Sequence, residues 1–291
     1  MRTFATLALA VFLLGCAGEA DHELADPAVV RLGVLPDQSK ESVVAKYAPL
    51  VDYLSRQTGL DIELVVPVDY AAMVRDFSAH RIHLANFGGL TFTEAERTDH
   101  AEPLVMRDTD LRFASCYLVT AADKRKSLDE FRGETFSFGP ELSTSGHLMP
   151  RYFLKAAEID PEAFFASTRH SAGHDETARW VRDGVVAIGV ANCMIVEGMH
   201  ADGRLGPDDI RVLETTPAYA DYVWAVHEHM GLDLKIRLRD AFMALDATDA
   251  GHRAILQTLG ATAYLPASRA DFNDVRRAAR DVDVAAMLGL E

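Results

Sequence analysis

One strand-to-helix junction decides how we interpret this chain: Ser137-Phe138-Gly139-Pro140-Glu141-Leu142-Ser143-Thr144-Ser145-Gly146-His147-Leu148-Met149-Pro150. The apolar run 135–138 predicts a strand that ends at Gly139-Pro140, and the pattern over 151–157 predicts a helix. Three hydroxyl residues and a glycine lie between them, where a helix leaves its first N–H groups without partners. These groups and the helix dipole attract anions, so Ser143, Thr144 and Ser145 are candidate ligand-binding residues. The alternative is an ordinary helix cap, which favours the same residue types.

Pro150 constrains the geometry of this junction. Proline is favoured at the first position of a helix, and Pro150 lies too far along the chain to take that position after Ser143. We therefore expect the Ser-Thr-Ser stretch to form a separate, irregular turn before the main helix.

The rest of the chain alternates between strand-like and helix-like patterns. Strands are predicted over 30–35, 61–66 and 82–87, with helices around 47–58 and 71–80 between them. A second unit of the same kind begins near residue 131, after a strand at 116–119 leaves the first unit, and residues 221–226 bring the chain back. The alternation predicts an α/β fold with largely parallel sheets, in which ligands bind beyond the carboxyl ends of the strands.

Three more stretches follow strands and should face the same cleft. They are Pro67-Val68-Asp69-Tyr70, then the turn at Gly88-Gly89, and the run Ser171-Ala172-Gly173-His174. Most are short polar or glycine-containing turns onto helix starts, which suits anion capture by backbone N–H groups. Tyr70 and His174 are therefore candidate contacts, and each alone is also compatible with a half-buried ring or a plain turn.

The N-terminus predicts export. Residues 1–15 have a positive start and a short apolar core, as a signal peptide does, and Leu13-Leu14-Gly15-Cys16 resembles a bacterial lipobox. We expect cleavage before Cys16 and lipid attachment to it, followed by a flexible tether over 16–28. The expected product is a periplasmic, membrane-anchored protein.

Composition narrows the function. The 291 residues are 49% hydrophobic and 25% charged, as in globular proteins, and the net charge is −15. A chain this acidic is a poor partner for nucleic acid. Its overall field also repels anions, so an anionic ligand has to be held by local donors.

Catalytic and metal motifs are not evident. The sequence has no Gly-x-Ser-x-Gly elbow, phosphate loop or His-Glu-x-x-His motif. Histidine pairs occur at 80/83, 170/174 and 227/229 without an indicated third ligand, and exposed histidines are the simpler interpretation. We expect neither an enzyme nor a cofactor or metal.

Two cysteines remain once Cys16 is set aside, namely Cys116 and Cys193. In an oxidising compartment they could form one disulfide, and each also lies in an apolar segment where free cysteine is often simply buried. The residues leave both possibilities open.

Six stretches taken together resemble the phosphate/phosphite/phosphonate-binding proteins, the periplasmic substrate-binding components of ABC transporters. The similarity runs from about residue 30 to residue 270, and the stretches are 47–54, 68–74, 87–91, 143–150, 173–174 and 221–226. It implies a type II periplasmic-binding fold, with two α/β lobes joined by two crossover strands: 29–115 and 223–291 in lobe 1, and 116–222 in lobe 2. It also implies a monomer that binds a small oxyanion and feeds an ABC permease. The implied contacts are Tyr70, Ser143–Ser145 and His174, with Gly88, Gly89, Asp221 and Tyr222 as weaker carry-overs.

Two departures from the family pattern affect the ligand. Many relatives have an acidic residue in the segment that here spans 185–192, and its loss disfavours aminoalkylphosphonates. Other features resemble branches that bind selenium oxyanions or sense arsenite beside a histidine kinase. In the arsenite branch a cysteine holds the ligand, which makes Cys116 a candidate contact and a sensor the alternative function.

Overall fold

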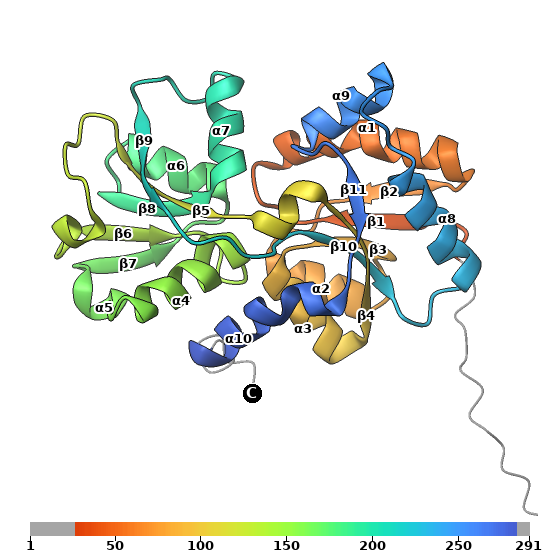
Figure 1. Cartoon of the computed structure of the whole chain (residues 1–291), viewed down its shortest axis with the longest axis horizontal. Helices are drawn as coiled ribbons and strands as arrows, with labels where there is room; N and C mark the ends of the chain where they lie inside the picture. Colours follow the sequence, from red (N-terminus) through yellow and green to blue (C-terminus); the bar gives the residue numbers. More distant parts are fainter. Residues whose placement is uncertain (1–26, 284–291) are drawn as a thin grey trace, which may run out of the picture.

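A computed structural model describes residues 27–283, which form two lobes, each built on one β-sheet flanked by helices (Figure 1). The predicted signal peptide, Cys16 and most of the predicted tether lie outside the described residues. Among residues 27–283, no helix has the length and apolar character that crossing a membrane requires.

The first lobe combines residues from both ends of the described chain. Its strands and helices are β1 (Val30–Val34), α1 (Lys40–Thr58), β2 (Ile62–Val65), α2 (Tyr70–Ser78), β3 (Leu84–Phe87), α3 (Gly89–Asp99), β4 (Ala101–Arg107), β10 (Val223–His227), α8 (Leu232–Met243), α9 (Ala250–Thr258), β11 (Tyr264–Pro266) and α10 (Asn273–Asp281). The expected end of the first helix is confirmed, because α1 stops where Gly59 adopts a left-handed conformation.

The second lobe is formed by the middle of the chain. Its elements are β5 (Ser115–Thr120), β6 (Thr135–Phe138), α4 (Met149–Ala156), α5 (Pro161–Phe164), β7 (Ser167–His170), α6 (His174–Arg182), β8 (Ile188–Asn192), α7 (Cys193–Ala201) and β9 (Ile210–Thr215). The expected irregular turn is also confirmed: a π-helical turn over Thr144–Leu148 precedes α4.

The prediction of largely parallel sheets needs a correction. The first sheet has the order β11-β4-β10-β3-β1-β2, and β10 lies antiparallel between β3 and β4. The second has the order β7-β6-β8-β5-β9, and β5 lies antiparallel between β8 and β9. Both inserted strands arrive directly from the other lobe, without the crossover helix that would turn them parallel to their neighbours.

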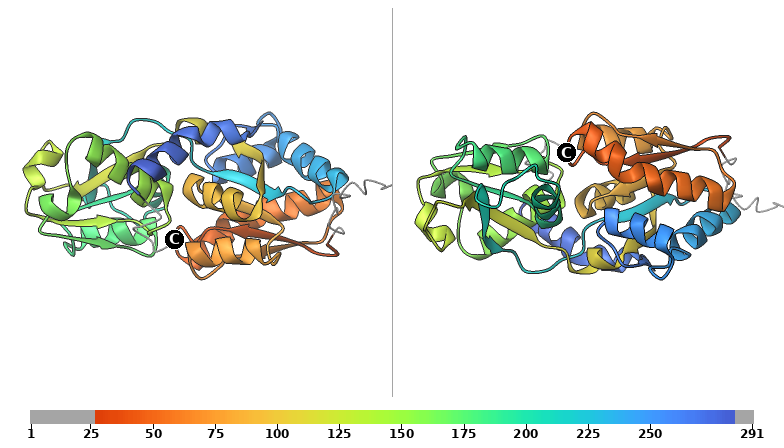
Figure 2. Two further views of the ribbon diagram at one scale, coloured as in Figure 1. Left: turned by 90° about the horizontal axis from the view of Figure 1, so that it is seen from below. Right: turned by 90° about the horizontal axis from the view of Figure 1, so that it is seen from above.

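Two connecting segments join the lobes and run side by side. The chain leaves β4 through a 3-10 turn at Asp108–Arg112, and it returns from β9 to β10 through residues 216–222. Phe113 and Tyr219 exchange two backbone hydrogen bonds, of 2.8 and 3.0 Å. Figure 2 shows these connections along one side of the molecule, at the top of its left view and the bottom of its right view. The two connections are therefore held together by backbone hydrogen bonds.

Helix α10 adds a contact between the lobes. Its Val275 and Ala278, with Phe272 just before it, belong to the same buried apolar cluster as Leu148 and Met149 of the second lobe. The lobes therefore share apolar packing that includes the end of the turn at Thr144–Leu148.

Candidate functional site

The Ser-Thr-Ser turn is held in place by its own backbone. Ser143 caps the turn, with its Oγ accepting the N–H of Gly146 at 3.0 Å. Gly146 packs against Gly139, because a Cβ at either residue would lie only 2.9 Å from the other's Cα. All three hydroxyl residues are buried. The turn is thus a rigid part of the second lobe.

Each hydroxyl of this turn has a different environment. The Oγ1 of Thr144 accepts the N–H of Leu90 from the first lobe at 2.9 Å. The Oγ of Ser143 lies 3.3 Å from Nε2 of His174. The Oγ of Ser145 is buried and has no hydrogen-bond partner.

His174 is the first residue of α6 and is completely buried. Its Nδ1 accepts the backbone N–H of Asn192 at 3.1 Å, so in the neutral ring the hydrogen is on Nε2, toward Ser143. Burial lowers the pKa of His174 to about 4. His174 is therefore a neutral donor at physiological pH.

Tyr70 faces the turn from the first lobe. It is the first residue of α2, whose N-terminus is capped by the side chain of Asp69. Burial raises the pKa of Tyr70 well above its usual range, and Asp37 and Asp221 raise it further. Its hydroxyl therefore stays protonated; it is buried beside the Ser143 hydroxyl and makes no well-formed hydrogen bond to a protein atom.

Asp221 is held by the Gly-Gly segment. Its Oδ1 accepts the N–H of Gly89 at 3.0 Å, and a Cβ on Gly88 would lie 3.2 Å from the same oxygen. Burial raises the pKa of Asp221 to about 7, although the Gly89 N–H and the neighbouring hydroxyls of Thr144 and Ser145 act in the opposite direction. The N–H groups of Gly89 and Leu90 are thus already bonded to protein atoms, so this segment positions Asp221 and Thr144.

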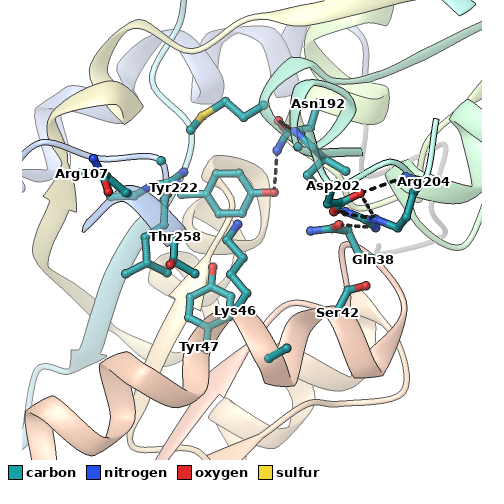
Figure 3. Close-up of a pocket in the computed structure, with 17 residues that line it drawn as sticks. Gln38, Ser42, Lys46, Tyr47, Arg107, Asn192, Asp202, Arg204, Tyr222 and Thr258 are labelled. Carbon is teal, nitrogen blue, oxygen red and sulfur yellow. Dashed lines mark hydrogen bonds and ion pairs between the residues drawn. The ribbon is translucent and has the colours of Figure 1, made fainter. Parts of the chain in front are cut away.

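Tyr222 joins three parts of the site. Its hydroxyl donates to Oδ2 of Asp37 at 3.0 Å and accepts from Nδ2 of Asn192 at 3.3 Å. Figure 3 shows Tyr222 pointing into a cavity of about 390 Å³ that opens beside these groups, with Lys46 and Tyr47 of α1 on one side. The backbone of Asp37 also accepts the N–H of His174 at 2.9 Å, so the two lobes contact each other across the site.

Four buried side-chain polar atoms within residues 27–283 have no hydrogen-bond partner: Asp37 Oδ1, Tyr70 OH, Ser145 Oγ and His227 Nε2. The ring of His227 stacks on Phe77 in the first lobe, outside this group. The other three belong to the cluster just described. Since buried polar atoms nearly always have partners, the cluster has the chemistry of a site for a small polar molecule.

Comparison with known proteins identifies the kind of site. Residues 32–272 match the family described as the periplasmic substrate-binding protein of the phosphonate ABC transporter. The chain belongs to this family. Members of the family are periplasmic substrate-binding components of transporters, and the resemblance inferred from the sequence is confirmed.

Individual relatives are similar over most of their length. The probable phosphite-binding protein PhnD1 of Prochlorococcus marinus is 26% identical over 270 residues, which cover 89% of this chain and 91% of the relative. The phosphate-import protein PhnD of Mycolicibacterium smegmatis is 26% identical over 230 residues, 74% of this chain and 71% of the relative.

A solved structure supports the fold. The structure of Prochlorococcus marinus PhnD1 in complex with methylphosphonate has a TM-score of 0.82 and 25% identity, and it covers 89% of this chain and all of that one. A binding-protein component of a phosphonate transporter from Pseudomonas aeruginosa has a TM-score of 0.79 at 21% identity, with coverage of 86% and 85%. The expected type II periplasmic-binding fold is confirmed.

Cys116 requires a correction. It forms a disulfide with Cys193, at a sequence separation of 77, and it belongs to the apolar core of the second lobe with Leu118 and Ala191. A disulfide sulfur has no thiolate to bind arsenite. The expectation that Cys116 holds a ligand as a free thiol is therefore wrong for this structure, and the two possibilities for the cysteines resolve to the bonded one.

The histidines also differ from the expectation of exposed side chains. His147 and His227 are buried, as His174 is, and burial lowers the pKa of His147 to about 3. His147 packs edge-on against Phe138 and accepts from Arg151 beneath the Ser-Thr-Ser turn. Its role in this position is to support the turn.

Sequence reasoning missed Asp37 and Asn192. Asp37 follows β1 at its carboxyl end, the same position relative to a strand that selected the other candidates. Asn192 ends β8 within the segment where many relatives have an acidic residue, and it caps α7. Both residues lie at the carboxyl end of a strand, and this position is the sequence signal that marks them.

Proposed function

We propose that this protein is a lipid-anchored extracytoplasmic binding protein for a small oxyanion of the phosphonate, phosphite or phosphate class, and that it delivers the ligand to an ABC permease. Family membership supports the transport role. The relatives' names support the ligand class, since they refer to phosphite, phosphate and methylphosphonate.

The three unpartnered polar atoms carry this proposal. Leaving a buried polar group without a partner costs roughly 1–3 kcal/mol, so a ligand that satisfies Tyr70, Ser145 and Asp37 together is strongly favoured. Two of these groups are hydroxyl donors, and the Nε2 of His174 is a third donor beside them. Neutral donors of this kind suit the oxygens of a tetrahedral oxyanion, because a donor bonded to an ionised acceptor makes a charge-assisted hydrogen bond.

In the proposed function, each remaining part of the chain has a role. Cleavage before Cys16 and lipid attachment to it would leave residues 16–28 as a tether. Lobe 1, from 29–115 and 223–291, would contribute Tyr70 and Asp37, and lobe 2, from 116–222, would contribute the Ser-Thr-Ser turn and His174. One ligand held by both lobes of a monomer would couple binding to closure about the paired connections.

The alternative of an arsenite sensor that acts on a histidine kinase loses its main support with the Cys116–Cys193 disulfide. A selenium oxyanion would use the same donors as phosphite, so it enters the test as another ligand.

Isothermal titration calorimetry on the mature chain tests the proposal. Methylphosphonate, phosphite, phosphate, selenite and arsenite are titrated separately, and at least one of the phosphorus oxyanions is expected to bind one-to-one. Arsenite is expected to give no thiol-dependent heat. If none of the five oxyanions binds, the proposal is wrong.

A further inference from the structure

Asp37 differs from the hydroxyl and imidazole groups of this site because, as a carboxylate, it only accepts hydrogen bonds. Its side chain is 2% exposed, Oδ2 already accepts from Tyr222, and Oδ1 has no partner. A carboxylate offers no hydrogen, so an anion's bare oxygen next to Oδ1 would meet repulsion in place of a bond.

Asp37 lies among the groups of the candidate site. Its backbone oxygen accepts the N–H of His174, which fixes it next to the ring that also reaches Ser143. Its charge raises the pKa of Tyr70, as the charge of Asp221 does, so both carboxylates are close to the Tyr70 hydroxyl. The titratable groups facing it are Lys46 and Tyr47 of α1, Tyr70 of α2, His174 of α6, and Tyr222 of the returning connection.

We infer that Asp37 selects oxyanions that carry a proton, by accepting the ligand's P–OH hydrogen at Oδ1. This rests on the proposed function and narrows its substrate class to oxyacids with a hydroxyl left at neutral pH. Phosphite, phosphate and alkylphosphonates have such a hydroxyl over part of this range, whereas sulfate and sulfonates have none. A shared hydrogen turns the contact between two anions into a charge-assisted O–H···O⁻ bond, which is among the stronger hydrogen bonds in proteins.

This role also bears on the missing acidic residue of segment 185–192. Asn192 there donates to Tyr222, and Tyr222 donates to Asp37, so the chain of bonds ends on a carboxylate supplied by the first lobe. A carboxylate acceptor is thus present, in the loop between β1 and α1 rather than in the segment where the family resemblance locates it.

A matched pair of ligands measures the contribution of the acidic P–OH hydrogen to binding. Methylphosphonate, at a pH below its second ionisation, and methanesulfonate have the same charge and nearly the same shape, and they differ in the acidic hydroxyl. Calorimetry on the mature wild-type chain is expected to show methylphosphonate bound at least about 10- to 100-fold more tightly, the range of one hydrogen bond to a charged group.

The variant Asp37→Asn replaces the acceptor Oδ1 with a hydrogen-bond donor. Its amide oxygen keeps the bond from Tyr222, which leaves the NH₂ group, a donor, where Oδ1 was. The preference for methylphosphonate over methanesulfonate should fall by about 10- to 100-fold, with methanesulfonate gaining affinity.

The control is Asp175→Asn, since Asp175 is equally buried at the lobe boundary and its Oδ2 is occupied by Ser39 N–H and Arg179. It should leave the preference unchanged, and circular dichroism reports whether each variant is folded.

The outcomes are distinct. Methylphosphonate binding with an unchanged preference in Asp37→Asn overturns this inference and leaves the proposed function intact. Equal affinity of the wild type for the two ligands overturns the inference without any variant. Failure of the wild type to bind any phosphorus oxyanion overturns the proposed function, and this inference with it.

Discussion

Two buried polar clusters lie where the lobes meet, and they differ in whether their hydrogen bonds are complete. At the first connection, Asp110 accepts from the backbone N–H and the Nε of Arg107 at 3.0 and 2.8 Å, and from its Nη2 as well. The remaining Nη1 donates to the backbone oxygen of Leu259. Beside it, the cluster of Tyr70, Ser145 and Asp37 has one unpartnered atom on each residue.

The two clusters show that positive charge does not mark the candidate anion site in this molecule. Arg107 is a buried cation near the site, yet each nitrogen of its guanidinium donates to a protein acceptor at the first connection. The cluster of Tyr70, Ser145 and Asp37, with Asp221 beside it, contains neutral donors and two carboxylates. Its unpartnered atoms are free to bind a ligand. The cluster with complete hydrogen bonds is structural, and the cluster with unpartnered atoms is the candidate binding site.

The largest effect is expected when the Arg107–Asp110 cluster is broken. Asp110→Ala leaves the Arg107 guanidinium buried without its counter-ion, and the free energy of unfolding should fall by about 3–5 kcal/mol in urea titrations. Asp202→Ala, which removes a half-exposed partner of Arg204, should cost about 0–1 kcal/mol. Unchanged stability with abolished oxyanion binding would assign this cluster to the ligand site instead.

Loss of the disulfide should have the next largest effect. Replacing Cys116 and Cys193 together with serine releases a long loop in the unfolded chain and should lower the free energy of unfolding by about 2–4 kcal/mol. The folded double variant should keep its oxyanion affinity, because the bond lies in the core of the second lobe. Loss of affinity in a variant that is still folded would make Cys116 a candidate ligand contact again.

Removing a donor from the cluster with unpartnered atoms should lower ligand affinity without lowering stability. Ser145→Ala is expected to weaken oxyanion binding by about 10- to 100-fold and to leave the stability of the ligand-free protein unchanged or slightly higher. The matched control is Ser137→Ala on β6, whose buried hydroxyl donates to the backbone oxygen of Phe138 at 2.8 Å. That variant should lose about 1 kcal/mol of stability and keep its affinity. Similar behaviour of the two serines would erase the distinction between the clusters.

The smallest effect concerns Asp221. Burial raises its pKa from the usual 3.8 to about 7, so the folded state binds a proton that the unfolded state has released above its own, lower pKa. Stability from this group is therefore complete below the unfolded value and is lost as pH rises through about 7. Between about pH 6.5 and 8, ligand-free wild type should lose about 1 kcal/mol relative to Asp221→Asn.

Urea titrations of both proteins at the two pH values measure this difference. The contributions of the buried histidines cancel in it, since they are the same in both chains. A difference that does not change with pH would show that Asp221 is already ionised in the folded protein.

The sequence predicted the architecture and the main loop, for physical reasons. Strand and helix periodicities are local, so β6, the end of α1 and the irregular turn before α4 were expected correctly from adjacent residues. The start of α1 was not, because the helix begins at Lys40, before the predicted range. Tyr70, Ser143–Ser145 and His174 were expected together because each begins a helix after a strand, and the structure does bring them together.

What the sequence could not provide depends on contacts distant along the chain. The antiparallel insertion of β5 and β10 follows from which lobe each strand enters from, and the Cys116–Cys193 bond from how β5 meets the start of α7. Asp37 and Tyr222 are 185 residues apart, and their hydrogen bond exists only after both lobes have folded. The pKa of Asp221 likewise comes from burial that no local pattern reports.

The most direct measurement is a crystal structure of the mature protein with methylphosphonate. The account predicts one ligand between the lobes, with its oxygens within hydrogen-bond distance of Tyr70 OH, Ser145 Oγ and His174 Nε2. A ligand found instead in the neighbouring cavity beside Lys46 and Arg107, with the Tyr70 and Ser145 hydroxyls still unpartnered, would contradict it.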